Sequence, residues 1–309
     1  MIKENSFAFI LNPVSSCGKS LKFWKSFEPL LHKHQINFIY KQTQKSGDAI
    51  ALTQEAINEG YRKIIAIGGD GTLHQVANGI LLQHDIDSKE ISMGLIPMGT
   101  GNDFGNYWKL PKRSEQIITQ LKKNSTILQD VIKVNFTAEN KTAFIISMGG
   151  CGFDSHVAVK AHNQKMKGHG GKLVYLRCLA TSLFSYKAQK VTVKIDDEKL
   201  SGKIFSVAIG NNHSNGGGIK QCPAATMTDG KLNITVIGDI SIPQILWNLK
   251  GLFTGGFTKH YKVKTFSGLK AALESDDKNI LEIDGEPYYN LPAEFEIIPA
   301  CLKVITPFN

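Results

Sequence analysis

Residues 63–82, KIIAIGGDGTLHQVANGILL, join an apolar run to an amphipathic stretch through a turn that holds three glycines in four positions. The apolar run is typical of a strand covered on both faces, and apolar residues recur at helical spacing from Leu73 onward. Glycine lets the backbone approach a ligand closely, and N–H groups at a helix N-terminus favour a phosphate. With Thr72 as the predicted N-cap, the stretch predicts a strand–turn–helix unit that binds an anion at its turn.

The same alternation continues through the first 125 residues or so. Predicted strands at 7–12, 36–42, 63–69 and 91–97 alternate with predicted helices at 20–34, 47–61, 72–82 and 114–123. Repetition of strand and helix predicts a parallel sheet with flanking helices, which is an α/β fold.

After about residue 128 the rhythm changes to short β-type runs. These lie at 130–136, 142–149, 190–196, 203–211, 232–238, 262–267, 279–285 and 293–299. They predict a mostly antiparallel β domain, interrupted by helical residues 154–187, with a loop at 165–172, and by one helix at 242–252. We predict domains at 1–128 and 129–309, with the extreme C-terminus as a candidate to return to the first.

Charge and cysteine usage narrow the class of protein. The chain carries 36 Lys and Arg against 27 Asp and Glu, a net charge of +9, which suits an anionic ligand or an anionic surface. The basic residues are dispersed and no nucleic-acid module is recognisable, so nucleic-acid binding is disfavoured. Five scattered cysteines without a C-x-x-C pair argue against disulfides or a zinc site and favour a reducing compartment.

The N-terminus and the apolar runs bear on localisation. The N-terminal stretch MIKENSFAFILNPV has an apolar core of only five residues and no cleavage site, so no signal peptide is expected. No apolar run approaches the roughly 18 residues that a membrane span needs. These features predict a cytoplasmic protein.

The first predicted strand runs into LNPVSSCGKS at 11–20, which ends like a Walker A loop. The position that should hold the first glycine of that loop is Pro13, which has no N–H for a phosphate. A Walker A loop is therefore rejected, although a strand exit followed by small residues remains. Lys19 is expected only to contribute a nearby positive charge.

A second glycine loop, PMGTGNDF at 97–104, follows the next predicted strand. Because the carboxyl ends of neighbouring parallel strands share one crevice, this loop and GGDGT are expected to lie together. Asp70 is unusual in a loop that binds only phosphate, and suits a metal, a ribose or a structural N–H. Three strand ends thus carry phosphate-type chemistry.

GGDGT followed by PMGTGNDF resembles the diacylglycerol kinase catalytic-domain family, which includes soluble bacterial lipid kinases and is related to sphingosine and ceramide kinases. GGDGT alone is shared with NAD kinases, but the Gly-Thr-Gly-Asn-Asp-Phe loop and a late Asp-Gly-Glu are much more specific. The further matching segments are Asn12-Pro13, Thr43 with Gly47-Asp48-Ala49, Gly152-Phe153-Asp154, Pro223-Ala224 with Asp229-Gly230, and Ile283-Asp284-Gly285-Glu286.

The resemblance implies transfer of the γ-phosphoryl group of ATP, with Mg²⁺, to a lipid hydroxyl such as that of diacylglycerol. The implied nucleotide contacts are Asn12, Pro13, Val14, Ser15, Ser16, Thr43, Gly68, Gly69, Asp70, Gly71, Thr72, Leu73, His74, Thr100, Asn102 and Asp103. Asp70 and Asp103 are also candidates near a catalytic Mg²⁺.

The resemblance also implies catalytic and metal residues. Glu286 is the expected proton acceptor, with Asp284 as the alternative base or as a residue that orders a metal-bound water. Asp229 with the carbonyls of Thr226 and Lys231 would hold a structural Mg²⁺. The plain alternatives are a β-turn with solvated acids at 284–286 and an ordinary hairpin turn at 229–230.

Three positions depart from the family pattern: Ser16 stands where it usually has Gly, His74 where it has Asn, and Thr228 where it often has Asp. They keep a non-catalytic nucleotide- or lipid-binding protein open as an alternative. An NAD kinase-like enzyme is the other alternative, disfavoured because no Asn-Glu pair of that type follows GGDGT.

Residues 242–264 mix Leu, Ile, Trp and Phe with four lysines and no acidic residue, and 165–172 is also basic. This composition suits peripheral contact with an anionic membrane. A core helix with a solvated lysine edge is the slightly favoured alternative. A homodimer is a further expectation.

Overall fold

The computed structural model describes residues 2–16, 18–167 and 172–307. The chain divides into two compact units, Met1–Gln129 with Ala300–Asn309 (unit 1) and Asp130–Pro299 (unit 2). The chain passes into unit 2 within β5 (Thr126–Phe136) and returns to unit 1 within β15 (Ala293–Ile305).

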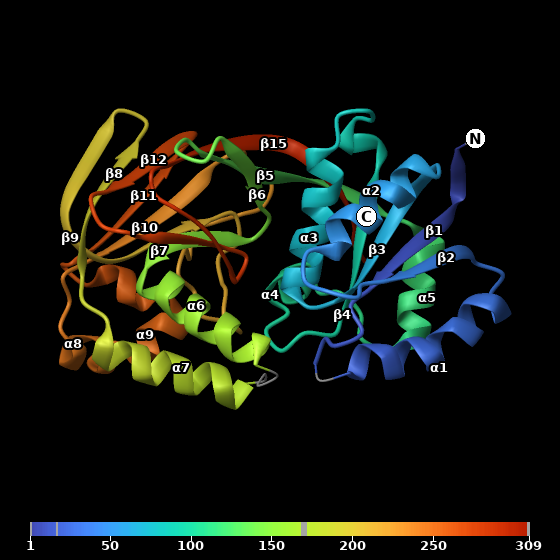
Figure 1. Ribbon diagram of the computed structural model, residues 1–309, viewed down its shortest axis with the longest axis horizontal. Helices are drawn as coiled ribbons and strands as arrows, with labels where there is room; N and C mark the ends of the chain where they lie inside the picture. Colours follow the sequence, from blue (N-terminus) through green and yellow to red (C-terminus); the bar gives the residue numbers. More distant parts are fainter. Residues whose placement is uncertain (1, 17, 168–171, 308–309) are drawn as a thin grey trace. The chain divides into compact units, whose positions relative to one another are not determined.

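The sheet of unit 1 is parallel, as predicted (Figure 1). It contains β1 (Lys3–Leu11), β2 (Asn37–Gln42), β3 (Tyr61–Gly68) and β4 (Ser92–Pro97) in the order β4-β3-β1-β2. The last part of β15 adds a further parallel pairing, with Lys303 opposite Ser92. The carboxyl ends of β1, β3 and β4 therefore lie at one edge of the sheet.

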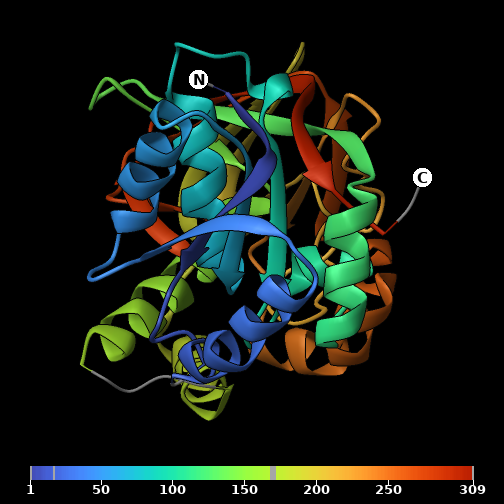
Figure 2. The same ribbon diagram turned by 90° about the vertical axis from the view of Figure 1, so that its right-hand side faces the viewer.

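Helices cover both faces of this sheet. α1 (Lys19–Lys33) and α5 (Ser114–Lys123) pack on the face that carries Phe9, whereas α2 (Asp48–Asn58) and α3 (Asp70–Leu82) pack against each other and against β1 and β3 (Figures 1 and 2). Burial on both faces explains the continuous apolar runs of β1, β3 and β4, whereas the edge strand β2 is only partly buried. Two short elements were not predicted: η1 (Ser88–Glu90) and α4 (Asp103–Tyr107).

Unit 2 is mostly antiparallel, which confirms the predicted change of sheet type. Its strands after β5 are β6 (Lys141–Ile145), β7 (Met148–Gly152), β8 (Gln189–Ile195), β9 (Glu198–Gly210), β10 (Leu232–Gly238), β11 (Val263–Gly268), β12 (Lys270–Ser275), β13 (Ile280–Ile283) and β14 (Glu286–Asn290). They pair in the order β14-β13-β7-β9-β8-β12-β15, with β10 beside β9 and β11 beside β10.

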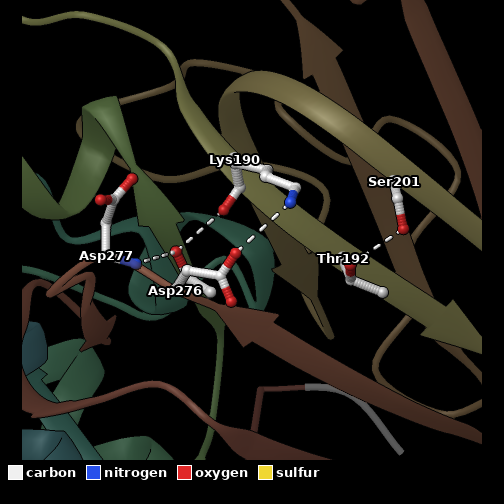
Figure 3. A network of polar contacts seen from close by, with 6 residues as sticks. Lys190, Thr192, Ser201, Asp276 and Asp277 are labelled. Atoms are coloured by element: carbon white, nitrogen blue, oxygen red, sulfur yellow. Dashed lines mark hydrogen bonds and ion pairs between the residues drawn. The ribbon is translucent and has the colours of Figure 1, made fainter.

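Strand β8 shows how these strands divide their side chains between core and solvent. Val191, Val193 and Ile195 point into the main apolar core of unit 2. On the other face, Thr192 Oγ1 lies 2.8 Å from Ser201 Oγ, and Lys190 lies 3.4 Å from Asp276 (Figure 3). One buried and one solvated face produce the alternating pattern in the sequence.

In the described part of unit 2 the helical elements are α6 (Phe153–Met166), α7 (Lys172–Ser185), α8 (Ile242–Trp247), α9 (Leu249–Thr254) and the short 3₁₀ turn η2 (Gly256–Lys259). The helical prediction for 154–187 is confirmed by α6 and α7, while residues 168–171 of the predicted basic loop lie outside the described residues. No helix in the described part of the chain is both long and apolar enough to cross a membrane.

The prediction of one continuous helix at 242–252 is wrong. Asn248 has φ −92° and ψ 8° and separates α8 from α9. Its side-chain Nδ2 donates to the carbonyl of Gln244 at 2.9 Å. An Asn side chain that bonds to the local backbone competes with helical hydrogen bonding, which accounts for the break.

Candidate functional site

The loops after β1, β3 and β4 are tied together by hydrogen bonds within unit 1. Asn12 Nδ2 donates to Thr72 Oγ1 at 3.2 Å, and the Met98 N–H donates to the Gly68 carbonyl at 2.7 Å. Ser16 Oγ donates to the Met98 carbonyl. The three strand ends that the sequence singled out therefore form one connected structure.

Gly69 and Gly99 lie close together where two of these loops meet. A Cβ atom added to Gly99 would lie only 2.6 Å from the Cα of Gly69. Asn102 holds the second loop in shape, since its Oδ1 accepts from the Gly99 N–H and its Nδ2 donates to the Gly99 carbonyl, each at 2.8 Å. Bare backbone thus forms the surface where the two loops meet.

Helix α3 begins at Asp70, so the prediction that Thr72 is its N-cap is wrong. Gly69 is the N-cap in an extended conformation, and its carbonyl accepts from Thr72 N–H at 3.0 Å and Leu73 N–H at 3.1 Å. Only glycine fits this position without a shift of the backbone, because a Cβ added to Gly69 would lie 3.0 Å from the Cα of Gly99. The positive end of the helix dipole therefore lies at the contact between the two glycine loops.

Asp70 faces the start of another helix. Its carboxylate oxygens lie 3.4 Å from the backbone nitrogens of Asp103 and Phe104, the first two residues of α4. A carboxylate near a helix N-terminus is favoured by the helix dipole. Of the partners that the sequence left open for Asp70, a structural N–H is the one observed, and this brings Asp70 and Asp103 together.

The other predicted nucleotide residues fall into buried and exposed groups. Thr43 is buried and its N–H donates to the Leu11 carbonyl at 2.9 Å. Leu73 and His74 are buried in α3, where His74 Nδ1 lies 3.3 Å from Asn78 Nδ2. The exposed or half-buried remainder comprises Pro13, Val14, Ser15, Gly71 and Thr100.

Ser16 adopts a backbone conformation that favours glycine, with φ +50°. This is the position where the family usually has Gly. A non-glycine residue in the left-handed region is uncommon and costs about 1 to 2 kcal/mol. The bond from Ser16 Oγ to Met98 offsets part of that cost.

In unit 2, the Asp-Gly pair forms the two-residue turn between β13 and β14. Asp284 has φ +50° and Gly285 has φ +84°, and Ile283 pairs with Glu286 across the turn. Positive φ at both central residues is the hairpin geometry that Asp-Gly favours. The β-turn considered as the plain alternative is therefore present, but the carboxylates of Asp284 and Glu286 also contact other parts of unit 2.

The Asp284 carboxylate accepts three backbone hydrogen bonds. The donors are the N–H groups of Ile146 at 3.0 Å, Ser147 at 2.8 Å and Met148 at 3.1 Å. These N–H groups lie where β6 ends and β7 begins, so the prediction of one strand over 142–149 is wrong. The Asp284 carboxylate thus accepts from N–H groups that, in a continuous strand, would be available to a neighbouring strand.

Glu286 is paired with a residue that the sequence did not single out. Its Oε2 lies 2.9 Å from Nδ1 of His162 on α6, and both side chains are partly buried. A carboxylate only accepts hydrogen bonds, so Nδ1 carries the hydrogen in this pair. Nothing in the local pattern of α6 distinguishes His162 from an ordinary surface residue.

A buried acid precedes the turn. Glu282 lies on β13, and burial, reinforced by the nearby charge of Asp154, raises its pKa well above the ordinary value. Its Oε2 accepts from the Gly285 N–H at 2.8 Å. Loss of solvation also raises the pKa of the half-buried Asp154, whose carboxylate accepts from Gln221 Nε2 at 2.9 Å and from Ser206 Oγ.

A second carboxylate, from outside the turn, contacts the predicted metal turn. Asp229 Oδ1 accepts from the Lys231 N–H at 3.1 Å, while Asp130 Oδ2 accepts from the neighbouring Gly230 N–H at 2.7 Å. Asp130 is buried on β5 and was missed because it is distant in sequence. Within the described residues, no group of three or more His, Cys, Asp and Glu side chains is placed to hold a metal.

Comparison with known proteins matches both halves of the chain to family models. Residues 6–134 match the diacylglycerol kinase catalytic domain, and residues 147–306 match the YegS C-terminal NAD kinase beta sandwich-like domain. The two models correspond to the α/β region and to the mostly antiparallel region.

Similar full-length proteins are also found. The chain is 28% identical over 278 residues to a Pectobacterium atrosepticum protein named "probable lipid kinase YegS-like", covering 90% of this chain and 89% of the relative. It is 28% identical to a Staphylococcus carnosus diacylglycerol kinase, covering 96% and 94%.

A solved structure shares the fold. A Bacillus anthracis diacylglycerol kinase crystal structure matches with a TM-score of 0.76 at 21% identity, covering 99% of this chain and 98% of that one. This likeness supports the architecture, while the family models and the glycine loops carry the assignment. The chain belongs to the diacylglycerol kinase catalytic-domain family and carries a YegS-type C-terminal β domain as its second half.

Proposed function

We propose that the protein is an ATP- and Mg²⁺-dependent lipid kinase that phosphorylates a lipid hydroxyl such as that of diacylglycerol. The proposal rests on one observation: in a protein of this family, hydrogen bonds join the three loops after β1, β3 and β4. Such a reaction needs a phosphate cradle, a divalent cation and a group that accepts the hydroxyl proton.

The cradle fits the phosphates of ATP. Gly69 and Gly99 meet as bare backbone, and the N-terminus of α3 opens at the same place, which is the arrangement that binds phosphate. ATP would supply the phosphoryl group that is transferred. The residues proposed to hold it are those of the three loops, principally Asn12, Ser15, Ser16, Gly69, Asp70, Gly71, Thr72 and Thr100.

Glu286 is the proposed proton acceptor. The carboxylate of Asp284 is engaged by three backbone N–H groups, so a proton there would cost hydrogen bonds that shape the turn. Glu286 instead contacts an ionisable side chain, with its Oε2 2.9 Å from Nδ1 of His162. We therefore assign Glu286 to receive the hydroxyl proton and Asp284 to position the turn.

The turn at Thr226–Lys231 is the proposed structural Mg²⁺ site. The carboxylates of Asp130 and Asp229 accept from the N–H groups of adjacent turn residues, Gly230 and Lys231. With the carbonyls of Thr226 and Lys231 they would form an all-oxygen donor set. Oxygen donors suit Mg²⁺, and Asp130 supplies a carboxylate where the family's second Asp is replaced by Thr228. The metal is proposed to order the turn.

ATP and membrane lipids meet at the inner surface of the cytoplasmic membrane, so we place the protein in the cytoplasm with peripheral membrane contact. The proposal is tested with radiolabelled ATP, Mg²⁺ and a panel of micellar lipids, with NAD as a soluble control. Label in one lipid, lost on omission of Mg²⁺ and in Glu286→Gln that still folds, supports the proposal.

The same assay separates the alternatives. Label in NAD would identify an NAD kinase-like enzyme instead. ATP binding without label in any acceptor would favour a non-catalytic protein, and the departures at Ser16 and His74 would then be the first positions to restore to Gly and Asn.

A further inference from the structure

Helices α8 and α9 expose four large apolar side chains. Trp247 is 90% exposed, Leu246 52%, Phe253 53% and Leu249 47%, and we call these four residues the α8–α9 face. Neither helix contains a buried residue, so the core-helix alternative for this segment is wrong. An exposed cluster of large apolar side chains marks an interaction site in proteins.

The side of α8 and α9 that is opposite to the α8–α9 face packs on the rest of unit 2. The face therefore points away from unit 2. Ile245 packs on the apolar cluster that includes Phe153 and Val157 of α6. The Leu252 carbonyl accepts from the Lys220 N–H at 2.8 Å. Figure 1 shows α8 and α9 outside the antiparallel strands of unit 2. These contacts hold the two helices against unit 2 and leave the α8–α9 face directed toward solvent.

The charged side chains of the segment that carries the face are all positive. Residues 242–264 contain Lys250, Lys259, Lys262 and Lys264 and no acidic residue. Tyr261 is exposed, and Lys262 Nζ lies 5.8 Å from its ring centroid. Trp and Tyr prefer the boundary between lipid headgroups and acyl chains, and lysines near a membrane are attracted to anionic headgroups.

The same charge argues against pairing with a second copy of the chain. A two-fold interface sets the same patch against itself, which would bring lysines close to lysines around an apolar centre. Like charges at a partly desolvated rim repel. An anionic lipid surface satisfies both the apolar side chains and the lysines.

We propose that the α8–α9 face docks unit 2 on an anionic lipid bilayer, with Trp247 and Phe253 entering the headgroup boundary and the surrounding lysines contacting headgroup phosphates. The inference deepens the proposed function by naming the surface and the charge of the membrane. Its biological purpose rests on the proposed function, but the binding itself does not.

The protein carries a built-in probe for this contact. Of its three tryptophans, Trp24 is 3% and Trp108 is 6% exposed, so Trp247 alone is exposed to solvent. We expect co-sedimentation with vesicles of phosphatidylcholine mixed with phosphatidylglycerol, much less with pure phosphatidylcholine. Tryptophan emission should shift to the blue and be quenched by brominated acyl chains on the anionic vesicles.

Matched variants test separately how the apolar side chains and the lysines contribute to vesicle binding. Trp247→Ala with Phe253→Ala should weaken vesicle binding by about tenfold or more, since each large apolar side chain contributes substantially when it leaves water. Lys250→Glu should weaken binding to anionic vesicles about fivefold, and added salt should mimic it. Leu269→Ala, at a 55% exposed residue in the β11–β12 turn, is the control and should bind like the parent.

Two results would overturn the proposal. One is sedimentation with vesicles while Trp247 stays accessible to a water-soluble quencher. The other is a double variant that binds vesicles like the parent but loses self-association in analytical ultracentrifugation, which would make the face an interface between copies.

Activity on a short-chain, water-soluble diacylglycerol separates this proposal from the proposed function. A double variant that keeps this activity but loses activity on vesicles supports docking. A parent that binds vesicles but labels no lipid would overturn the proposed function and leave the docking surface standing.

Discussion

His162 and Glu286 lie 124 residues apart in sequence, yet Nδ1 of the histidine is 2.9 Å from Oε2 of the glutamate. The contact joins α6 to the first residue of β14, directly after the Asp-Gly turn. It orients the carboxylate that we propose accepts the proton from the lipid hydroxyl. His162 is thus a positioning residue, because it acts through Glu286.

Replacing His162 with Phe should lower kcat by about 10- to 100-fold, which corresponds to loss of one hydrogen bond to a charged group. The KM for ATP should change little, because the proposed phosphate cradle lies in unit 1. His162→Gln retains an N–H donor and should recover part of the lost rate. An unchanged kcat in His162→Phe would contradict the assigned role.

Replacing Asp284 should mainly lower the stability of the protein, whereas replacing Glu286 should mainly lower its activity. Asp284→Asn replaces an acceptor of three backbone N–H groups by a side chain that also carries donors. We expect a loss of about 2 to 4 kcal/mol in the free energy of unfolding, measured by urea denaturation. Glu286→Gln should unfold within about 1 kcal/mol of the parent and yet lose lipid phosphorylation. Equal stability of the two variants would argue against a positioning role for Asp284.

Glu282 should make stability depend on pH. Burial raises its pKa in the folded protein, whereas the unfolded chain has an ordinary value of about 4.3. The folded state therefore retains the proton over a range in which the unfolded state releases it, and the contribution to stability falls as pH rises through that range.

Glutamine at position 282 imitates the protonated acid at every pH. The difference in melting temperature between Glu282→Gln and the parent should therefore increase from pH 4 upward in favour of the variant, as measured by thermal scans in a series of buffers. A constant difference would show that Glu282 titrates alike in both states.

Gly99→Ala should disrupt the nucleotide loops. The added Cβ would lie 2.6 Å from the Cα of Gly69, so one of the two backbones must move, at a cost of about 1 to 3 kcal/mol. We expect weaker ATP binding by isothermal titration calorimetry together with a lower melting temperature. Gly202→Ala is the control, since a Cβ there meets no atom within 4 Å. Unimpaired ATP binding in Gly99→Ala would place the phosphates away from these loops.

Mg²⁺ should stabilise the protein through the turn that holds Asp229. Adding Mg²⁺ at about one hundred times its dissociation constant should raise the free energy of unfolding by about 2.7 kcal/mol, with a matching rise in melting temperature. Asp229→Ala should abolish this rise, whereas Asp197→Ala, in an exposed turn, should leave it intact. A rise that survives in Asp229→Ala would locate Mg²⁺ elsewhere.

Features that depend on neighbouring residues could be predicted from the amino-acid sequence. Continuous apolar runs identified the parallel strands, glycines identified the turns after β3 and β4, and Asp-Gly identified the hairpin at 284–285. Periodicity and turn chemistry act over a few residues, so they can be read without a fold. The boundaries that failed, at Asp70, Asn248 and 146–147, are places where a capping or side-chain contact competes with local propensity.

Which of these residues contact one another could be seen only in the folded chain. Asp130 reaches the Gly230 N–H across 100 residues of sequence, and His162 reaches Glu286 across 124. The topology of unit 2 sets these distances, and no local pattern encodes them. The exposure of Trp247 was likewise visible only in the fold. A large apolar side chain is expected to be buried, and only the arrangement of the surrounding elements shows that none of them covers this one.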